Sequence, residues 1–114
     1  MRVLVAEDKP RMARLMQRAL TSEGYSVSLA SDGEQALSIG LLGGLDVIVL
    51  DVMLPRRSGF DVIRGLRAAK PVGVLADQAF LAELLVVARC SGGEEAVEPA
   101  RAVCSLFPHG TWAS

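Results

Sequence analysis

The stretch DVIVLDVMLP, residues 46–55, decides how the rest of the chain is interpreted. Its apolar run from Val47 to Leu50 is uninterrupted, which is typical of a strand covered on both faces in a parallel sheet. Asp51 follows this run directly. In α/β sheets, ligands collect beyond the carboxyl ends of the strands. Asp51 is therefore predicted to lie at the edge of the sheet where a ligand would bind.

Strands and helices are predicted to alternate on both sides of this stretch. The valine-rich start favours a strand, Pro10 suits the first position of a helix, and Asp32 can cap another. A helical stripe of apolar residues consists of Met12, Leu15, Met16, Ala19 and Leu20. The expected elements are strands over residues 2–6, 25–30 and 46–50 and helices over residues 10–23, 33–42 and 60–70. This order predicts an α/β fold with a doubly wound parallel sheet and right-handed crossovers.

Residues 71–114 differ in character from residues 1–70, so we place a boundary between them. Residues 72–76 predict a fourth strand, which Gly73 weakens. Residues 78–89 are apolar nearly all round and predict a buried helix, and residues 96–107 predict one more short helix. No fifth strand is evident. The sheet is expected to be incomplete at its C-terminal end, and no output domain is expected.

Composition and charge exclude several function classes. The chain has 114 residues, of which 51% are hydrophobic and 22% charged, with a net charge of −1. No apolar stretch is long enough to span a bilayer, and Glu7 and Asp8 interrupt the first one, so we expect a cytoplasmic protein. There is no basic face, and we expect no direct nucleic-acid binding. Cys90 and Cys104 lack metal-site spacing and are expected to be free thiols.

Acidic residues follow two of the predicted strands. Glu7 and Asp8 come after the first strand, and Asp51 comes after the third. If those strands are neighbours, three carboxylates meet at one edge and repel one another, and a divalent cation relieves that repulsion. Oxygen-only ligands suit Mg²⁺, and aspartate is a known acceptor in covalent phosphoryl transfer. A purely structural alternative is that Asp8 caps the helix that begins at Pro10.

Four strings give these residues a family context: VLVAED at 3–8, DGEQAL at 32–37, DVIVLDVMLP at 46–55 and SGFDV at 58–62. They resemble the receiver domain of bacterial two-component response regulators of the winged-helix transcription-factor class. The resemblance implies a flavodoxin-like (CheY-like) fold. It also implies that the chain is a phosphorelay module and not an enzyme, and it is compatible with a homodimer. It also implies that Asp51 accepts a phosphoryl group from a sensor histidine kinase. Mg²⁺ would be held by Glu7, Asp8, Asp51 and the backbone carbonyl of Met53.

The second half of the chain departs from the receiver pattern. Ala76 stands where receivers carry a serine or threonine, and no lysine follows Lys70. Lys70-Pro71 reads as a helix end, and Arg101 is a poor substitute for the missing ammonium. A divergent receiver half, a fused segment and out-of-frame translation remain open as origins of residues 71–114.

Three other functions are alternatives to that of a phosphoacceptor. A pseudo-receiver, which binds partners without efficient phosphoryl transfer, is the strongest alternative. A haloacid-dehalogenase-type phosphatase needs a second aspartate two residues after the first, where this chain has Met53. A dinucleotide-binding domain needs GxGxxG after the first strand, where this chain has Glu7 to Pro10.

Overall fold

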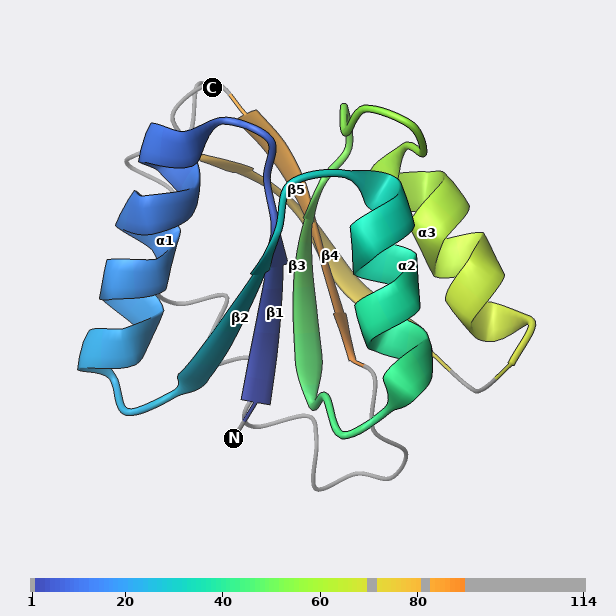
Figure 1. Ribbon diagram of the computed structural model, residues 1–114, viewed down its shortest axis with the longest axis horizontal. Coiled ribbons are helices and arrows are strands. Elements are labelled where there is room, and N and C mark those ends of the chain that lie inside the picture. Colours follow the sequence, from blue (N-terminus) through green and yellow to red (C-terminus); the bar gives the residue numbers. More distant parts are fainter. Residues whose placement is uncertain (1, 70–71, 81–82, 90–114) are drawn as a thin grey trace.

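The strands form one sheet with helices on both faces (Figure 1) in the computed structural model, which describes residues 2–69, 72–80 and 83–89. Helix α1 covers one face, and α2 and α3 lie side by side on the other. The elements are β1 (Arg2–Ala6), α1 (Pro10–Ser22), β2 (Ser26–Ala30), α2 (Gly33–Leu42), β3 (Val47–Asp51), α3 (Gly59–Arg67), β4 (Gly73–Phe80) and β5 (Glu83–Arg89). The predicted order of the first six elements is confirmed. Among the described helices, none has the length and apolar character needed to cross a membrane.

The sheet has the strand order β2-β1-β3-β5-β4. Strand β1 pairs in parallel with β2 on one side and with β3 on the other. Ala6, the last residue of β1, is opposite Ala30 of β2 and Leu50 of β3. The carboxyl ends of these three strands therefore meet at one edge, as the alternation of strands and helices predicted.

The prediction for residues 78–89 was wrong. They were expected to form a buried helix, and no fifth strand was expected, but the structure has β4 through Phe80 and a fifth strand, β5, from Glu83. A short apolar run fits a strand buried on both faces as well as a helix, so periodicity alone cannot separate the two. The adjacent valines at 86 and 87 favour the strand. The predicted helix over residues 96–107 lies outside the described residues.

The parallel sheet predicted from residues 1–70 is confirmed for β1, β2 and β3, but the two later strands are antiparallel. Strand β5 pairs antiparallel with β3, and β4 pairs antiparallel with β5 at the edge of the sheet. Only two residues separate β4 from β5, which suits a hairpin, whereas parallel neighbours need a long crossover. The flavodoxin-like order 2-1-3-4-5 is thus kept for the first three strands, and β5 takes the place beside β3.

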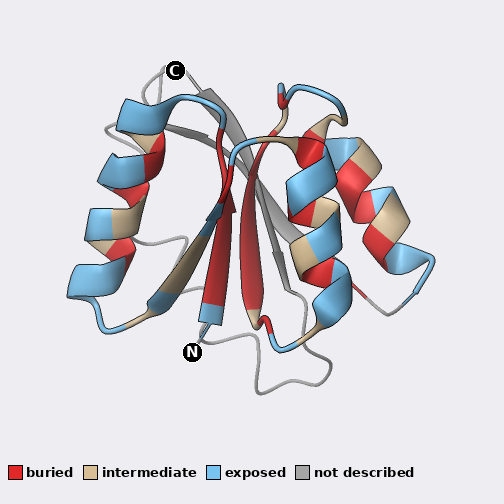
Figure 2. Ribbon diagram, viewed as in Figure 1, coloured by how far each residue is buried: buried red, intermediate tan, exposed pale blue. Residues whose placement is uncertain are grey.

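The buried core lies between the sheet and its helices (Figure 2). All four apolar residues from Val47 to Leu50 are fully buried, which is the physical reason for their uninterrupted run. The predicted apolar stripe of α1 needs one change, because Leu15 is 44% exposed and Ala13 is buried instead. Helix α1 therefore faces the sheet with Ala13, Met16 and Leu20.

Helices α2 and α3 pack closely because each has a glycine opposite a leucine of the other. A Cβ atom at Gly40 would lie 2.6 Å from Leu66 Cδ2, and a Cβ atom at Gly65 would lie 2.8 Å from Leu37 Cδ1. Both distances are shorter than a normal carbon–carbon contact, so the glycines provide space that the leucines fill. Leu66 is fully buried and belongs to the main apolar cluster.

Side-chain caps begin both of these helices. Asp32 accepts a hydrogen bond from the backbone N–H of Gln35 at 2.8 Å, and Ser58 accepts one from that of Asp61 at 3.2 Å. An ion pair with Arg64 lowers the pKa of Asp61 by a hydrogen bond and by its charge. The predicted cap at Asp32 is confirmed.

Replacing Ser58 by alanine leaves the backbone N–H of Asp61 without its cap. We expect the free energy of unfolding to fall by about 1 kcal/mol, the usual cost of losing an N-cap. Urea denaturation followed by circular dichroism measures it. Ser38→Ala, at an exposed position inside α2, is the control and should cause no loss, because alanine is the better helix former. Equal losses for both variants would contradict the capping role.

Candidate functional site

Three carboxylates converge where β1 and β3 end. Glu7 and Asp8 follow β1, and Asp51 is the last residue of β3. One oxygen from each of the three carboxylates lies within 4.8 Å of the others. They meet because β1 and β3 are parallel neighbours, with Ala6 opposite Leu50. The side chains that the sequence proposed for a metal site are thus brought together.

The three carboxylates differ in exposure. Glu7 is 2% exposed and Asp51 is 1% exposed, whereas Asp8 is open to solvent. Burial disfavours a charged carboxylate, and neighbouring charges of the same sign disfavour it further. A cation with its own positive charge offsets both effects. The site therefore combines two enclosed carboxylates with one that a hydrated ion can reach directly.

The structural alternative for Asp8 does not hold. The residue at the N-cap of α1 is Lys9, and no side chain caps that helix. Pro10 occupies the start of α1 as predicted. Asp8 is thus held in the connection between β1 and α1 without serving as a helix cap.

Backbone groups of the following loop and of α3 lie beside Asp51. The N–H of Met53 donates to Asp51 Oδ1 at 2.9 Å, so the backbone of residue 53 lies directly beside the carboxylate. Met53 itself is 80% exposed. The chain returns to the end of β3 at the first residue of α3, where the N–H of Gly59 donates to the carbonyl of Val52 at 3.0 Å. A Cβ atom at Gly59 would lie 2.8 Å from the Asp51 carbonyl oxygen, so only glycine permits this close return.

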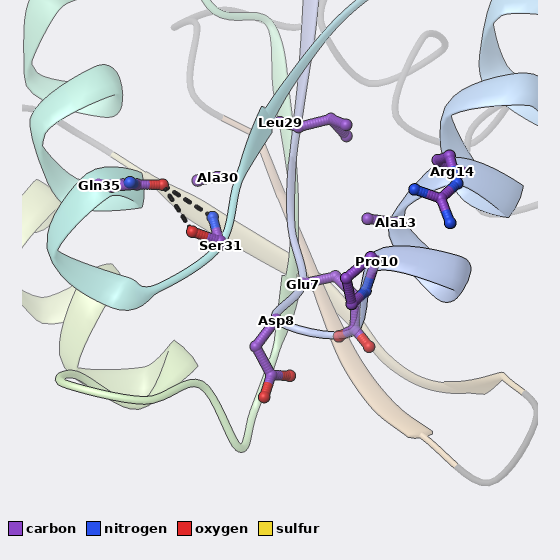
Figure 3. Close-up of a pocket in the computed structure, with 9 residues that line it drawn as sticks. All are labelled: Glu7, Asp8, Pro10, Ala13, Arg14, Leu29, Ala30, Ser31 and Gln35. Carbon is purple, nitrogen blue, oxygen red and sulfur yellow. Dashed lines mark hydrogen bonds between the residues drawn. The ribbon is translucent and has the colours of Figure 1, made fainter.

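A pocket of about 270 Å³ adjoins the two carboxylates that follow β1. Figure 3 shows Glu7 and Asp8 at one end, with Leu29 of β2 and Arg14 of α1 toward the other. Ser31 and Gln35 form a further wall, where the Gln35 side-chain oxygen accepts hydrogen bonds from the N–H and the hydroxyl of Ser31 at 2.9 and 3.0 Å. The pocket gives solvent a route to the acidic end of β1.

The donor set suits a magnesium ion. All three groups are carboxylates, and hard oxygen ligands of this kind bind Mg²⁺ in preference to softer metals. Mg²⁺ keeps several of its waters and uses few protein ligands, which fits a cluster with one open side. The arrangement of Glu7, Asp8 and Asp51 is therefore chemically compatible with the ion that the family resemblance implied.

The sequence prediction missed the neighbours of the loop over residues 52–58. The N–H of Gly33, at the start of α2, donates to the carbonyl of Pro55 at 3.1 Å. The Arg57 guanidinium pairs with Glu34, with 2.6 Å between Nε and Oε1. Considered locally, the stretch from Pro55 to Gly59 predicts only a turn. The opposite charges of Glu34 and Arg57 were the available signal for this contact. Local periodicity does not show that two segments more than twenty residues apart are in contact.

One of the residues at which the second half departs from the receiver pattern, Ala76, lies in the described part of the chain. Ala76 lies in β4, which β5 separates from β3, and the strand residue opposite Asp51 is Leu85. Lys70, Pro71 and Arg101 lie outside the described residues, as do Cys90 and Cys104. In the described part of the chain, the strand beside Asp51 is therefore the antiparallel strand β5, and not a parallel fourth strand.

Comparison with known proteins gives a family for this arrangement. Residues 3–81 match the response regulator receiver domain family. The chain is 46% identical over 69 residues to the transcriptional regulatory protein DltR of Streptococcus agalactiae, covering 60% of this chain and 31% of DltR. The chain spans about a third of the length of this curated relative.

Solved structures agree with this family. The response regulator TrrA of Thermotoga maritima, in complex with Mg²⁺-BeF, is 36% identical with a TM-score of 0.58, covering 60% of each chain. TrrA has also been solved in complex with the histidine kinase ThkA. The receiver domain of a sensor histidine kinase from Pseudomonas aeruginosa, with magnesium in its active site cleft, is 34% identical with a TM-score of 0.57, covering 59% of this chain and 55% of its own. The chain belongs to the response regulator receiver domain family.

Proposed function

We propose that this chain is a phosphorelay module in which Asp51 accepts a phosphoryl group and Glu7, Asp8, Asp51 and the Met53 carbonyl hold Mg²⁺. The observation that carries the proposal is the meeting of the three carboxylates at the ends of β1 and β3, with one oxygen of each within 4.8 Å of the others. Glu7 and Asp8 supply negative charge beside the acceptor, and Asp51 stands alone at the end of a buried strand. The magnesium-bound relatives support the same choice of ion.

The chemistry is a transfer between a phosphohistidine and a carboxylate. An Asp51 oxygen forms a bond to phosphorus as the bond from phosphorus to the imidazole nitrogen breaks. The imidazole keeps that electron pair, and Asp51 becomes an acyl phosphate. Bound Mg²⁺ would neutralise charge on the phosphoryl oxygens. The N–H of Met53 at 2.9 Å holds one Asp51 oxygen in place, which leaves the other for the attack.

A sensor histidine kinase is the proposed donor. TrrA has been solved with the histidine kinase ThkA, and the present chain is 36% identical to TrrA over the matched part. DltR is a transcriptional regulatory protein, so control of transcription is the proposed outcome in a full-length protein of that kind. This chain alone is still predicted not to bind DNA, since its net charge is −1.

A pseudo-receiver is the second candidate, and one observation favours it. Ala76 offers no hydroxyl, and β5 lies between β4 and the acceptor strand β3. Removing a preorganised donor from a transition state typically lowers the rate by about 10²–10³. With no hydroxyl at residue 76 and no lysine after Lys70, phosphorylation at Asp51 is expected to be slow.

Labelling with acetyl phosphate distinguishes the two candidates. We expect slow, Mg²⁺-dependent addition of one phosphoryl group to the wild type, measured by intact-protein mass spectrometry. Asp51→Asn should show none, because an amide oxygen is a much poorer nucleophile than a carboxylate. Asp46→Asn is the matched control at the opposite end of β3 and should label like the wild type.

Each result of this experiment has a clear meaning. Equal labelling of the wild type and Asp51→Asn would reject Asp51 as the acceptor. Labelling of the wild type that persists after chelation of Mg²⁺ would reject the metal's role. A complete absence of labelling, with Mg²⁺ binding intact, would favour the pseudo-receiver.

A further inference from the structure

We propose that the first turn of α2 positions the loop over residues 52–58 and thereby sets the affinity of the acidic site for Mg²⁺. Gly33 and Glu34 do not belong to the carboxylate cluster. They would act as positioning residues, which hold the loop beside the cluster without contacting the ion. The inference rests on the proposed function, because it concerns how well the same site binds its metal.

One contact between the start of α2 and the loop joins their backbones. The N–H of Gly33 donates to the Pro55 carbonyl at 3.1 Å. A Cβ atom at Gly33 would lie 2.2 Å from the Arg57 carbonyl oxygen and 2.5 Å from its Cβ. Both distances are far below van der Waals contact, and the atoms met include the backbone. Any side chain at residue 33 must therefore displace the loop or the start of α2.

Two ion pairs join the same segments side by side. Arg56 Nε lies 3.5 Å from Asp32 Oδ2, and Arg57 Nε lies 2.6 Å from Glu34 Oε1. Arg56 also has a φ of 69°, a left-handed conformation that is unfavourable for a residue with a side chain. A backbone in that conformation persists only where surrounding contacts fix it. The structure provides two kinds of contact at this point: the contacts with α2, and the hydrogen bond within the loop from the N–H of Arg57 to the Pro55 carbonyl at 2.8 Å.

The displaced part of the loop is directly connected to the acceptor. Pro55 is two residues beyond Met53, whose N–H holds Asp51 Oδ1 at 2.9 Å. The other end of the loop is fixed by the hydrogen bond from Gly59 to Val52 at 3.0 Å. With both ends fixed, a shift at residues 55–57 changes the backbone at residues 53 and 54. The α2 contacts thus control the backbone that lies beside the acceptor carboxylate.

Two neutral substitutions in α2 test the role of Gly33. Gly33→Ala should raise the dissociation constant for Mg²⁺ about tenfold, the lower end of the usual effect of a residue that orients metal ligands. Gly40→Ala is the matched control in the same helix, because its Cβ would meet the Leu66 side chain instead of the loop. It should lower the melting temperature and leave the dissociation constant within about twofold of the wild type. Isothermal titration calorimetry measures the affinity, and thermal denaturation without metal measures stability.

A charge swap tests the ion pair independently of the glycine. Arg57→Glu should raise the Mg²⁺ dissociation constant about two- to fivefold, as expected for an exposed pair. The direction of this change in affinity is informative, because added negative charge near the site would by itself lower the Mg²⁺ dissociation constant. The double variant Arg57→Glu/Glu34→Arg should restore the wild-type affinity, since it rebuilds the pair and conserves net charge. Arg64→Glu on α3 carries the same charge change and is the control.

The outcomes separate this inference from the proposed function. Wild-type protein that binds Mg²⁺, together with Gly33→Ala of equal affinity, would overturn the positioning role and leave the proposed function intact. A swap that fails to restore affinity after Arg57→Glu has lowered it would reject the ion pair. Wild-type protein without Mg²⁺ binding would reject the proposed function, and this inference with it.

Discussion

Replacing Asp8 by asparagine is expected to weaken Mg²⁺ binding about ten- to thirtyfold. Asp8 is the exposed member of the carboxylate cluster, so its charge interacts with the ion mainly through water. Two unit charges about 4 Å apart in water contribute roughly 1 kcal/mol, and Mg²⁺ carries two charges. A loss of about 2 kcal/mol corresponds to the expected change in affinity. The rise in melting temperature on adding Mg²⁺ should shrink accordingly, because metal stabilises only the folded state that binds it.

The same substitution should have the opposite effect without metal. Asp8→Asn removes repulsion with Glu7 and Asp51, so the metal-free variant should melt at a higher temperature than the wild type. Thermal denaturation in chelator and in excess Mg²⁺ measures both effects. Glu23→Gln, at the other end of α1, removes one charge away from the cluster and should alter neither. An unchanged Mg²⁺ response in Asp8→Asn would show that this carboxylate does not help to hold the ion.

The second large effect concerns the packing of α2 against α3. Leu66→Ala should reduce the free energy of unfolding by about 2–5 kcal/mol, since the side chain is fully buried and its removal leaves a cavity. Whole domains are stable by only about 5–15 kcal/mol, so the variant will be close to unfolding. Gly40→Ala alone should cost about 1–3 kcal/mol by overpacking against Leu66. Urea denaturation gives these values directly.

The double variant Gly40→Ala/Leu66→Ala tests the contact itself. With Leu66 shortened, the new methyl group at residue 40 no longer meets Cδ2, so the combined loss should be smaller than the sum. Strict additivity would mean that the two residues do not share this space. Leu42→Ala is the control, because Leu42 is 85% exposed at the end of α2 and should change stability by less than about 0.5 kcal/mol.

The first half of the fold could be predicted because its patterns are local. The run from Val47 to Leu50 is buried on both faces, and Asp32 caps α2 as its position suggested. The second half could not, because a short apolar segment is compatible with a helix or a strand. What decides residues 83–89 is pairing with β3, a contact between segments more than thirty residues apart. Local propensity carries no information about such a partner.

The candidate site was predictable for a topological reason. Once β1 and β3 are parallel neighbours, residues that follow them must lie at one edge, and Glu7, Asp8 and Asp51 do so. The support from Gly33 and Glu34 was not predictable. It depends on the start of α2 touching the loop after Asp51, and neither segment marks the other in its own sequence.

The central position of β1 and β3 has a consequence for hydrogen exchange. Each has a strand on both sides, and their residues are almost entirely buried, so their amides should exchange only when the whole domain opens. Strand β2 lies at the edge, and its Leu29 is 37% exposed, so its amides can exchange through local opening. The acidic residues are thus attached to the strands that are expected to exchange most slowly. Local fluctuations of the periphery will therefore leave the separation of their backbones nearly unchanged.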